Sequence, residues 1–259
     1  MEHVSSSAYK LFLISLSCMF INGCQTTESS DSSDKHSGVS GSSAQLILFD
    51  GAVYSLASNK LVRVDIDDVT QPVIDNEQRL GSFEAQTLTT DGEQLYLGSP
   101  GEVRIYDYAD GQIRFIDSAV RDIPGDDPVI TDGEYAYSTV ITLESETEDG
   151  TKIGQGDLYV YEIDSANNIT ELAFYPRLGY LKGLALWDKT LMVCDPLDGL
   201  MQLDVTDPLT VSTVSTFADA PCNDLVHLGG GHFVTVGEEG IFQLMPDADG
   251  AFSVVSGFN

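Results

Sequence analysis

Hydrophobic and polar positions alternate with a period of two through most of the chain, in short runs separated by turn residues. "LVRVDI" (61–66) and "LMQLDV" (200–205) each carry apolar side chains at alternate positions. Such alternation over four to eight residues, rich in Val, Ile and Leu, predicts half-buried β-strands. No stretch of residues 44–259 repeats its apolar positions at helical spacing over several turns, so the pattern predicts an all-β domain.

These runs recur in larger units. Asp50, Asp91 and Asp132 each precede a glycine and are spaced 41 residues apart. Asp-Gly between two apolar runs is typical of hairpin turns, which need positive φ. Five units of four runs follow one another, and a repeat of about this length predicts a β-propeller of about five four-stranded antiparallel blades. A six-bladed ring, completed by a cryptic or partner-donated blade, is the alternative. We expect the fifth blade to meet the first without strand exchange.

The first residues predict export. An apolar run of 11 residues, 11–21, is shorter than the roughly 20 residues that span a bilayer, and "INGC" ends at Cys24. This resembles a bacterial lipobox, which implies a lipoprotein signal peptide over 1–23 and a lipid on Cys24. By the same resemblance, Gln25 favours the outer membrane. The alternative is an ordinary secretory signal with a chance cysteine. Residues 24–43 lack large apolar side chains and predict a flexible tether to the 44–259 domain.

Two segments carry a family resemblance. "LMQLDVTDPLTVSTVSTF" (200–217) and "LVRVDIDDVTQP" (61–72) are similar to the bacterial LVIVD repeat, a strand followed by an Asp-rich turn. In that family a second strand precedes the motif, and "LMVCD" (191–195) and "YSLAS" (54–58) stand in those places. The resemblance implies a secreted or lipidated propeller. It implies no shared chemistry and no functional residue.

Charge and cysteine content narrow the possible partners. The formal net charge is −29, which argues against nucleic acid and anionic lipid surfaces as partners.

Cys18 lies in the predicted signal peptide, so Cys194 and Cys222 remain in an exported domain that permits disulfides. One ends the second strand of the fourth unit and the other enters the first strand of the fifth, which predicts a Cys194–Cys222 disulfide. Two independent buried thiols are the alternative.

The candidate site is one face of the propeller. The connections between second and third strands and those between blades lie on the same face, where ligands usually bind. On this face we expect the residues Gln45, Gln86, Asp126, Asp127, Lys182, Asn223 and Asp224. An insertion in the third unit, 142–156, adds Glu144, Glu146, Glu148 and Asp149. We interpret it as a solvated loop, with a partner contact or a Ca²⁺ site as alternatives.

These features predict an outer-membrane lipoprotein whose propeller is a scaffold, without cofactor or catalytic residue, for an envelope protein or an extracellular ligand. The alternative is a periplasmic or surface hydrolase. Asp127 and Asp224 resemble the axial carboxylates of five-bladed glycoside hydrolases, where two acids share the catalytic roles. A hydrolase is expected to hold such an acid pair in a dry pocket and to raise the pKa of one member.

Overall fold

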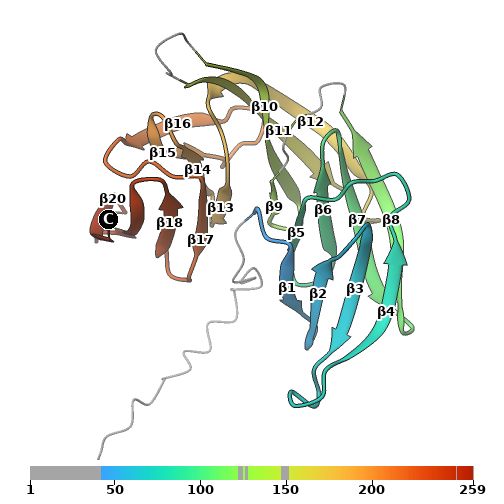
Figure 1. The fold of residues 1–259 in the computed structure, drawn as a ribbon. Helices are drawn as coiled ribbons and strands as arrows, with labels where there is room; N and C mark the ends of the chain where they lie inside the picture. Colours follow the sequence, from blue (N-terminus) through green and yellow to red (C-terminus); the bar gives the residue numbers. More distant parts are fainter. Residues whose placement is uncertain (1–41, 122–124, 126–127, 147–151, 249, 259) are drawn as a thin grey trace, which may run out of the picture. The chain divides into compact units, whose positions relative to one another are not determined.

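The computed structural model describes residues 42–121, 125, 128–146, 152–248 and 250–258 (Figure 1). Twenty strands form five antiparallel sheets, each built from four strands that are consecutive in the chain. This confirms the predicted all-β fold of five four-stranded blades, with no strand exchanged among them. Within the described ranges there is no helix that could cross a membrane. The predicted signal peptide, Cys24 and most of the tether lie outside these ranges.

The blades are numbered along the chain. Blade 1 holds β1 (Leu46–Phe49), β2 (Ala52–Leu56), β3 (Lys60–Asp65) and β4 (Val73–Arg79). Blade 2 holds β5 (Thr87–Thr90), β6 (Leu95–Ser99), β7 (Glu102–Ala109) and β8 (Gln112–Val120). Blade 3 holds β9 (Val129–Thr131), β10 (Tyr135–Glu146), β11 (Lys152–Ile163) and β12 (Ile169–Gly179). Blade 4 holds β13 (Leu184–Trp187), β14 (Thr190–Asp195), β15 (Gly199–Asp204) and β16 (Ser212–Phe217). Blade 5 holds β17 (Asp224–His227), β18 (Phe233–Gly237), β19 (Gly240–Pro246) and β20 (Phe252–Phe258).

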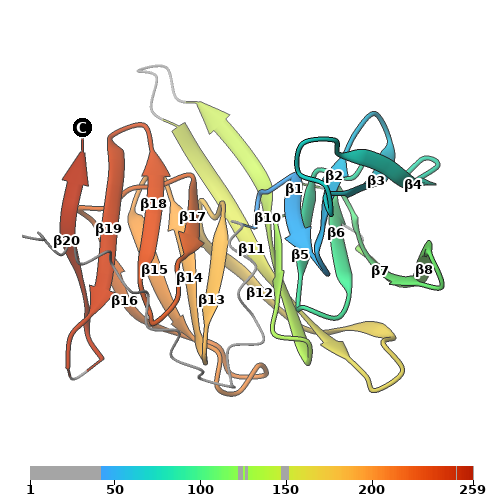
Figure 2. The same ribbon diagram turned by 90° about the horizontal axis from the view of Figure 1, so that it is seen from below.

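The core consists of four apolar clusters, each between two consecutive blades. The first joins Ile47 and Tyr54 of blade 1 to Leu97 of blade 2, and the last joins Met192 of blade 4 to Phe233 of blade 5. The other two lie between blades 2 and 3 and between blades 3 and 4. Figures 1 and 2 show the sheets following one another in chain order. A single blade cannot bury both of its faces, so stacking supplies most of the buried apolar area.

Every blade carries the same irregularity. The register between its third and fourth strands shifts by one residue, for example between Arg63 and Val64 in blade 1 and between Gln243 and Leu244 in blade 5. The equivalent shift is present in blades 2, 3 and 4. A β-bulge of this kind increases the local twist of the outer strand. Its recurrence shows that the five units are structural equivalents although their sequences diverge.

The aspartates of the LVIVD-like segments form turns. The Asp204 carboxylate accepts the Thr206 N–H at 2.8 Å, and that of Asp207 accepts the Leu209 N–H at 2.9 Å. In blade 1, Asp65 and Asp68 accept the N–H groups two residues further on in the same way. These contacts close the connection between the third and fourth strands, as Asx-turns do. The motif therefore has a structural role in both blades.

The blade 3 insertion differs from the expected loop. β10 and β11 stay paired as far as Glu146 and Lys152, so Glu144 and Glu146 lie on a strand of an extended hairpin. Backbone pairing continues because each added residue extends an existing ladder, which the polar, glycine-containing sequence does not reveal. Glu148 and Asp149 lie outside the described residues, as do the side chains at 142–146.

Contact between blades 5 and 1 is the second difference. The repeat pattern predicts that these blades meet. Among the described residues, however, no buried apolar cluster joins them, and the four clusters present link only consecutive blades. The stacking of consecutive blades is therefore that of a propeller, but no buried apolar cluster of described residues closes the ring between its first and last blades.

Candidate ligand-binding site at the entry face

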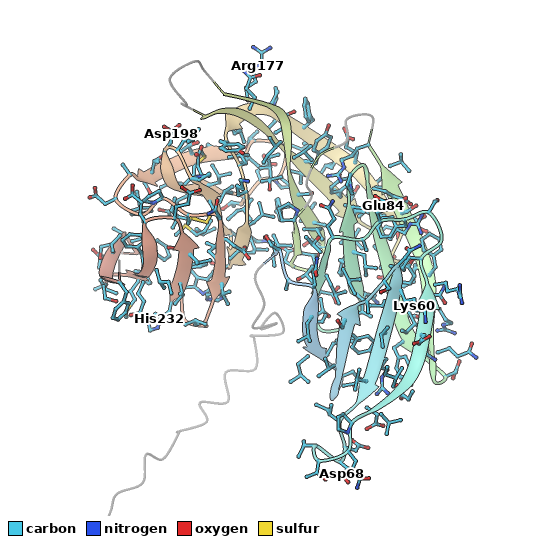
Figure 3. The ribbon with its side chains drawn as sticks, viewed as in Figure 1. Lys60, Asp68, Glu84, Arg177, Asp198 and His232 are labelled. Carbon is cyan, nitrogen blue, oxygen red and sulfur yellow. A yellow bond between two sulfur atoms is a disulfide. The ribbon has the colours of Figure 1, made fainter. Side chains whose placement is uncertain are left out.

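We call the face that bears the segments leading into the inner strands the entry face. The connections between second and third strands share it, and the connections between third and fourth strands lie at the other end of the blades. In blade 1, Figure 3 shows Asp68, in the β3–β4 turn, well removed from Glu84, in the segment that leads into blade 2. Those residues predicted for the site that the structure describes belong to the entry face.

A cavity of about 240 Å³ opens on the entry face, and we call it the entry cavity. Segments that enter different blades contribute to its wall. The lining residues are Ser43, Gln86, Thr87, Pro128, Ile141, Leu181, Lys182, Gly183 and Asn223. The structure therefore brings together three of the residues that sequence placed on this face: Gln86, Lys182 and Asn223. Gln45 lies two residues after Ser43 of the wall but is not itself a lining residue.

Backbone hydrogen bonds between blades hold these segments. The Gly183 N–H donates to the Asn223 carbonyl at 3.0 Å, which fixes blade 4 to blade 5. The Thr139 hydroxyl of blade 3 donates to the Lys182 carbonyl at 2.6 Å. Lys182 is thus positioned by its neighbours on both sides, and its ammonium lies 4.9 Å from the centre of the Tyr180 ring. The wall therefore combines one basic residue, Lys182, with the side-chain amides of Gln86 and Asn223 and with apolar side chains such as Ile141 and Leu181.

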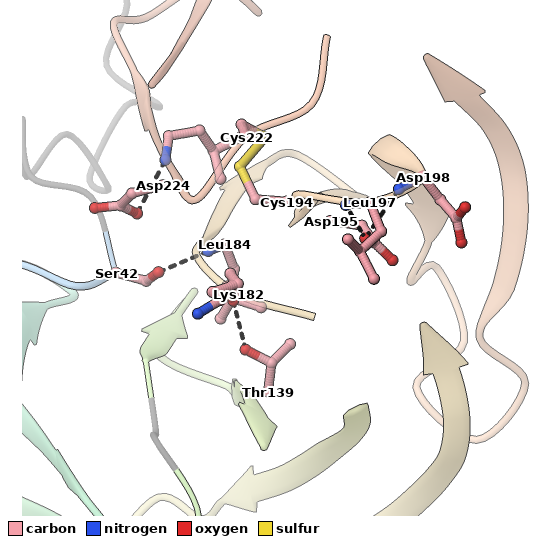
Figure 4. Close-up of a disulfide and its surroundings, with 11 residues drawn as sticks. Ser42, Thr139, Lys182, Leu184, Cys194, Asp195, Leu197, Asp198, Cys222 and Asp224 are labelled. Carbon is pink, nitrogen blue, oxygen red and sulfur yellow. Dashed lines mark hydrogen bonds between the residues drawn. A yellow bond between two sulfur atoms is a disulfide. The ribbon is translucent and has the colours of Figure 1, made fainter. Parts of the chain in front are cut away.

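The chain just before β1 was missed as a site element. Ser42, assigned to the tether by composition, is fully buried, and its hydroxyl accepts the Leu184 N–H at 2.6 Å (Figure 4). Two residues on, the Ala44 carbonyl accepts the Leu88 N–H at 2.7 Å. This segment therefore contacts blades 4 and 2 before it enters blade 1. No sequence signal marks it, because its anchoring depends on a small side chain that reaches a backbone group on a distant strand.

Asp224 lies at the start of β17, beside the wall of the entry cavity. One carboxylate oxygen accepts the Leu225 N–H at 2.9 Å, and the carboxylate packs so closely on Gly183 that a Cβ there would clash with it. Burial raises the pKa of Asp224, and hydrogen bonds from the Leu225 N–H and the Ser43 side chain oppose this effect. The carboxyl group is therefore held in a partly desolvated position.

The predicted disulfide is present. Cys194 and Cys222 are joined with a Cα–Cα distance of 5.1 Å, and both are fully buried in the apolar cluster between blades 4 and 5. Cys194 belongs to β14, and Cys222 directly precedes Asn223 of the cavity wall (Figure 4). The bridge therefore fixes the segment that presents Asn223 and Asp224.

A second cavity, of about 420 Å³, lies where the connection from blade 1 to blade 2 meets the β6–β7 turn. Arg104 lies over the Phe83 ring at 4.1 Å and makes two hydrogen bonds to Glu102, at 2.8 and 3.0 Å. The buried Arg121 guanidinium donates to the Ser138 hydroxyl and to the Ser99 carbonyl, at 3.0 and 2.9 Å. These arginines are engaged by the protein itself, so the larger cavity is the weaker binding candidate.

The other residues predicted for the site lie outside the described part of the chain, wholly or in their side chains, so they are not placed at the entry cavity. Asp126, Asp127, Glu148 and Asp149 lie outside the described residues, and only the backbone is described for Glu144 and Glu146. In the part of the chain that the structure describes, no three His, Cys, Asp or Glu side chains are grouped to hold a metal ion.

Comparisons with known proteins identify structural neighbours only. No protein-family model matches the chain, and no curated protein matches it. A solved structure from Lactobacillus plantarum is similar at 13% identity and a TM-score of 0.49, over 81% of this chain and 68% of that one. A functionally unknown protein from Desulfotomaculum acetoxidans is similar at 11% identity and a TM-score of 0.45, over 78% and 77%. Neither assigns a function to this chain.

Proposed function

We propose that this protein is a non-catalytic binding scaffold that holds a protein partner at its entry face. The observation that carries the proposal is the entry cavity, whose wall is built by the segments entering different blades. Its volume of about 240 Å³ is below the roughly 300–1,000 Å³ of usual small-molecule pockets. It suits one side chain or a short loop of a partner, with Lys182 and the amides of Gln86 and Asn223 as polar anchors.

Anchoring to the cell envelope belongs to the same proposal. The lipobox-like "INGC" and Gln25 support a lipid on Cys24 and placement at the outer membrane. Two or three acyl chains, at about 0.8 kcal/mol per buried methylene, hold a protein firmly on a bilayer. The LVIVD-like segments support the same assignment, because the resemblance is to a group of mostly secreted or lipidated propellers. Such an anchor would keep the scaffold near envelope partners.

A photo-reactive residue at position 223 tests the binding role. In native membranes, irradiation is expected to yield one dominant covalent adduct, identified by mass spectrometry, and Lys182→Ala is expected to reduce its yield several-fold. The matched control carries the photo-reactive residue at Asp164, an exposed carboxylate in the β11–β12 turn at the other end of the blades. Equal adducts from both positions, or none from position 223, would contradict the proposal.

A hydrolase is the second candidate, and one observation favours it: burial raises the pKa of Asp224. A general acid needs such a shift. Its proposed partner, Asp127, lies outside the described residues. Hydrolysis of a panel of chromogenic glycosides, lost in Asp224→Asn but kept in the exposed control Asp219→Asn, would establish this candidate. No turnover by the wild-type protein across the panel would eliminate it for those substrates.

A further inference from the structure

The two terminal blades each have one face that no other blade covers. Blades 2, 3 and 4 pack through both faces, because the four buried clusters lie between consecutive blades. Blade 1 uses only the face toward blade 2, and blade 5 only the face toward blade 4. We call the two remaining surfaces the blade 1 end face and the blade 5 end face. No buried cluster of described residues covers either one.

The blade 1 end face has one row that is apolar across all four strands, next to a mixed row of Leu46, Ser55, Val62 and Glu77. Directly paired residues lie on the same side of a sheet, and one row runs Leu48, Val53, Val64, Ile74. Leu48 is 63% exposed and Ile74 is 58% exposed. Leu46, on the same side of β1, is also exposed. In blade 2, by contrast, Leu88 and Leu97 on the side facing blade 1 are fully buried.

The blade 5 end face carries a shorter apolar row, which begins after Asp224 of β17 and covers the other three strands. One row runs Val236, Ile241, Phe258 across β18, β19 and β20. Phe258 is 70% exposed and Val236 is 49% exposed. The next row inward runs Val226, Val234, Gln243, Ser256, so it is apolar on β17 and β18 and polar on β19 and β20. Single exposed apolar side chains are ordinary on a protein surface, but a contiguous row on a sheet face marks an interaction surface.

We propose that a second copy of this chain covers both end faces, with blade 5 of one copy packed on blade 1 of the other. In each buried cluster, one blade packs through the face that is turned toward the next blade in the chain. That next blade packs through the face that is turned back toward the blade before it. Blade 5 has no next blade and blade 1 has no preceding blade, so one face of each is left. A second copy offers the matching face for both. This is a head-to-tail contact, and two such contacts related by a twofold axis close a dimer.

Charge at the rims supports the same pairing. Lys60 and Arg79 are paired residues at the β2–β3 hairpin end of the blade 1 end face. Glu238 and Glu239 form the corresponding hairpin of blade 5, between β18 and β19. Between Lys189 and Asn259 the sequence has no Lys or Arg. If blade 5 of one copy stacks on blade 1 of the other with their β2–β3 and β18–β19 hairpins at the same end, Lys60 and Arg79 lie beside Glu238 and Glu239 in this aligned stacking. Lys60 also contacts Glu77 at 2.5 Å within blade 1.

Cysteine cross-linking between two differently tagged full-length copies tests the contact. One copy carries Leu48→Cys and the other Val236→Cys, and both are solubilised from membranes in mild detergent and oxidised. We expect covalent dimers carrying both tags, at a yield several-fold above that from either copy alone or from the protein without added cysteines. The matched control replaces Leu48→Cys by Val214→Cys, an equally exposed valine on the outer strand of blade 4, and is expected to give background yield.

Other occupants give different results. If the ring closes within one chain, a copy carrying both Leu48→Cys and Val236→Cys forms its bridge internally and the mixed copies do not cross-link, which overturns the proposal. If another protein covers the end faces, neither the disulfide between copies nor the disulfide within the doubly substituted copy forms. That result also overturns the proposal.

A charge exchange gives a second readout of the same arrangement. Arg79→Glu, added to the Leu48→Cys copy, is expected to lower the dimer yield several-fold. Glu238→Lys with Glu239→Lys, added to the Val236→Cys copy, is expected to restore it. A yield that neither change moves would overturn the aligned stacking.

Discussion

Individual carboxylates in this acidic protein have distinct structural roles. Asp91 accepts the Glu93 and Gln94 N–H groups at 2.7 Å, and Asp132 accepts two N–H groups in the same way. Asp50 instead adopts φ of 46°, with Gly51 at 69°, in a two-residue hairpin. The repeated Asp-Gly therefore forms two kinds of turn, and in both it closes a hairpin. Asp224 differs from these turn carboxylates, because partial burial against Gly183 raises its pKa.

Asp224→Asn is expected to stabilise the domain at neutral pH. Burial raises the pKa of Asp224 above its value in the unfolded chain, so the folded state binds the proton more tightly. Stability is then lost as pH rises through the interval between the unfolded and folded pKa values, and the full cost is present above the folded pKa. Thermal melts of the wild type and Asp224→Asn are expected to coincide at pH 3.5 and to differ at pH 7.

Asp219→Asn is the matched control for this experiment, because Asp219 is an exposed carboxylate in the same segment. Its melting temperature is expected to follow the wild type at both pH values. A lower melting temperature of Asp224→Asn at pH 7 would contradict the prediction and show that the ionised carboxylate stabilises the fold.

At the scale of elements, stability depends on how blades are joined. Strands within a blade are held by local hairpins, whereas neighbouring blades rely on apolar clusters and a few cross-blade hydrogen bonds. Tyr175 of blade 3, for example, donates its hydroxyl to the Pro208 carbonyl at 2.8 Å. Only the junction between blades 4 and 5 adds a covalent link among the described residues.

Replacing Cys194 and Cys222 together by Ala is expected to lower the free energy of unfolding by about 3.5 kcal/mol, the loop-entropy value for a bridge of this span. The bridge encloses a separation of 28 residues and is fully buried. Urea titration under non-reducing conditions measures the change. An unchanged midpoint in the double variant, or two alkylatable thiols in the unreduced wild-type domain, would contradict it.

Shortening the blade 3 hairpin is expected to leave the melting temperature nearly unchanged. The extension of β10 and β11 beyond Ile141 and Gly156 lies outside the repeat, and its two strands pair with each other. The variant replaces residues 144–154 by a two-residue turn and keeps Gly156, where a Cβ would clash with Leu181 and Gly179. Calorimetry tests this, and a large loss of stability would show that the hairpin packs on the rest of the domain.

The whole molecule combines an acidic propeller with a predicted lipid anchor. The net charge of −29 disfavours electrostatic binding to anionic lipid surfaces, so the membrane attachment that we propose depends on the lipid at Cys24. The stacked blades also present two kinds of surface: an entry face with a cavity and two end faces that each carry an exposed apolar row.

Cys24→Ala is expected to move the protein from the membrane fraction to the soluble fraction, because a thiol at this position is needed to carry the lipid. Cell fractionation with immunodetection measures it, and Cys18→Ala is the matched control that is expected to remain in the membrane. Retention of Cys24→Ala in the membrane fraction would refute lipidation at this residue.

The sequence by itself determined the strands, the hairpins, the five-unit repeat and the cysteine pairing. These features depend on period-two patterning, on turn residues with positive φ and on spacing, all of which are local or regular along the chain. The tertiary structure decided the rest. It anchored Ser42 on blade 4, packed Asp224 against Gly183 and extended the blade 3 hairpin. It also left the two end faces without a buried cluster of described residues. Each of these depends on which surfaces from distant parts of the chain meet, and periodicity within one unit carries no information about that.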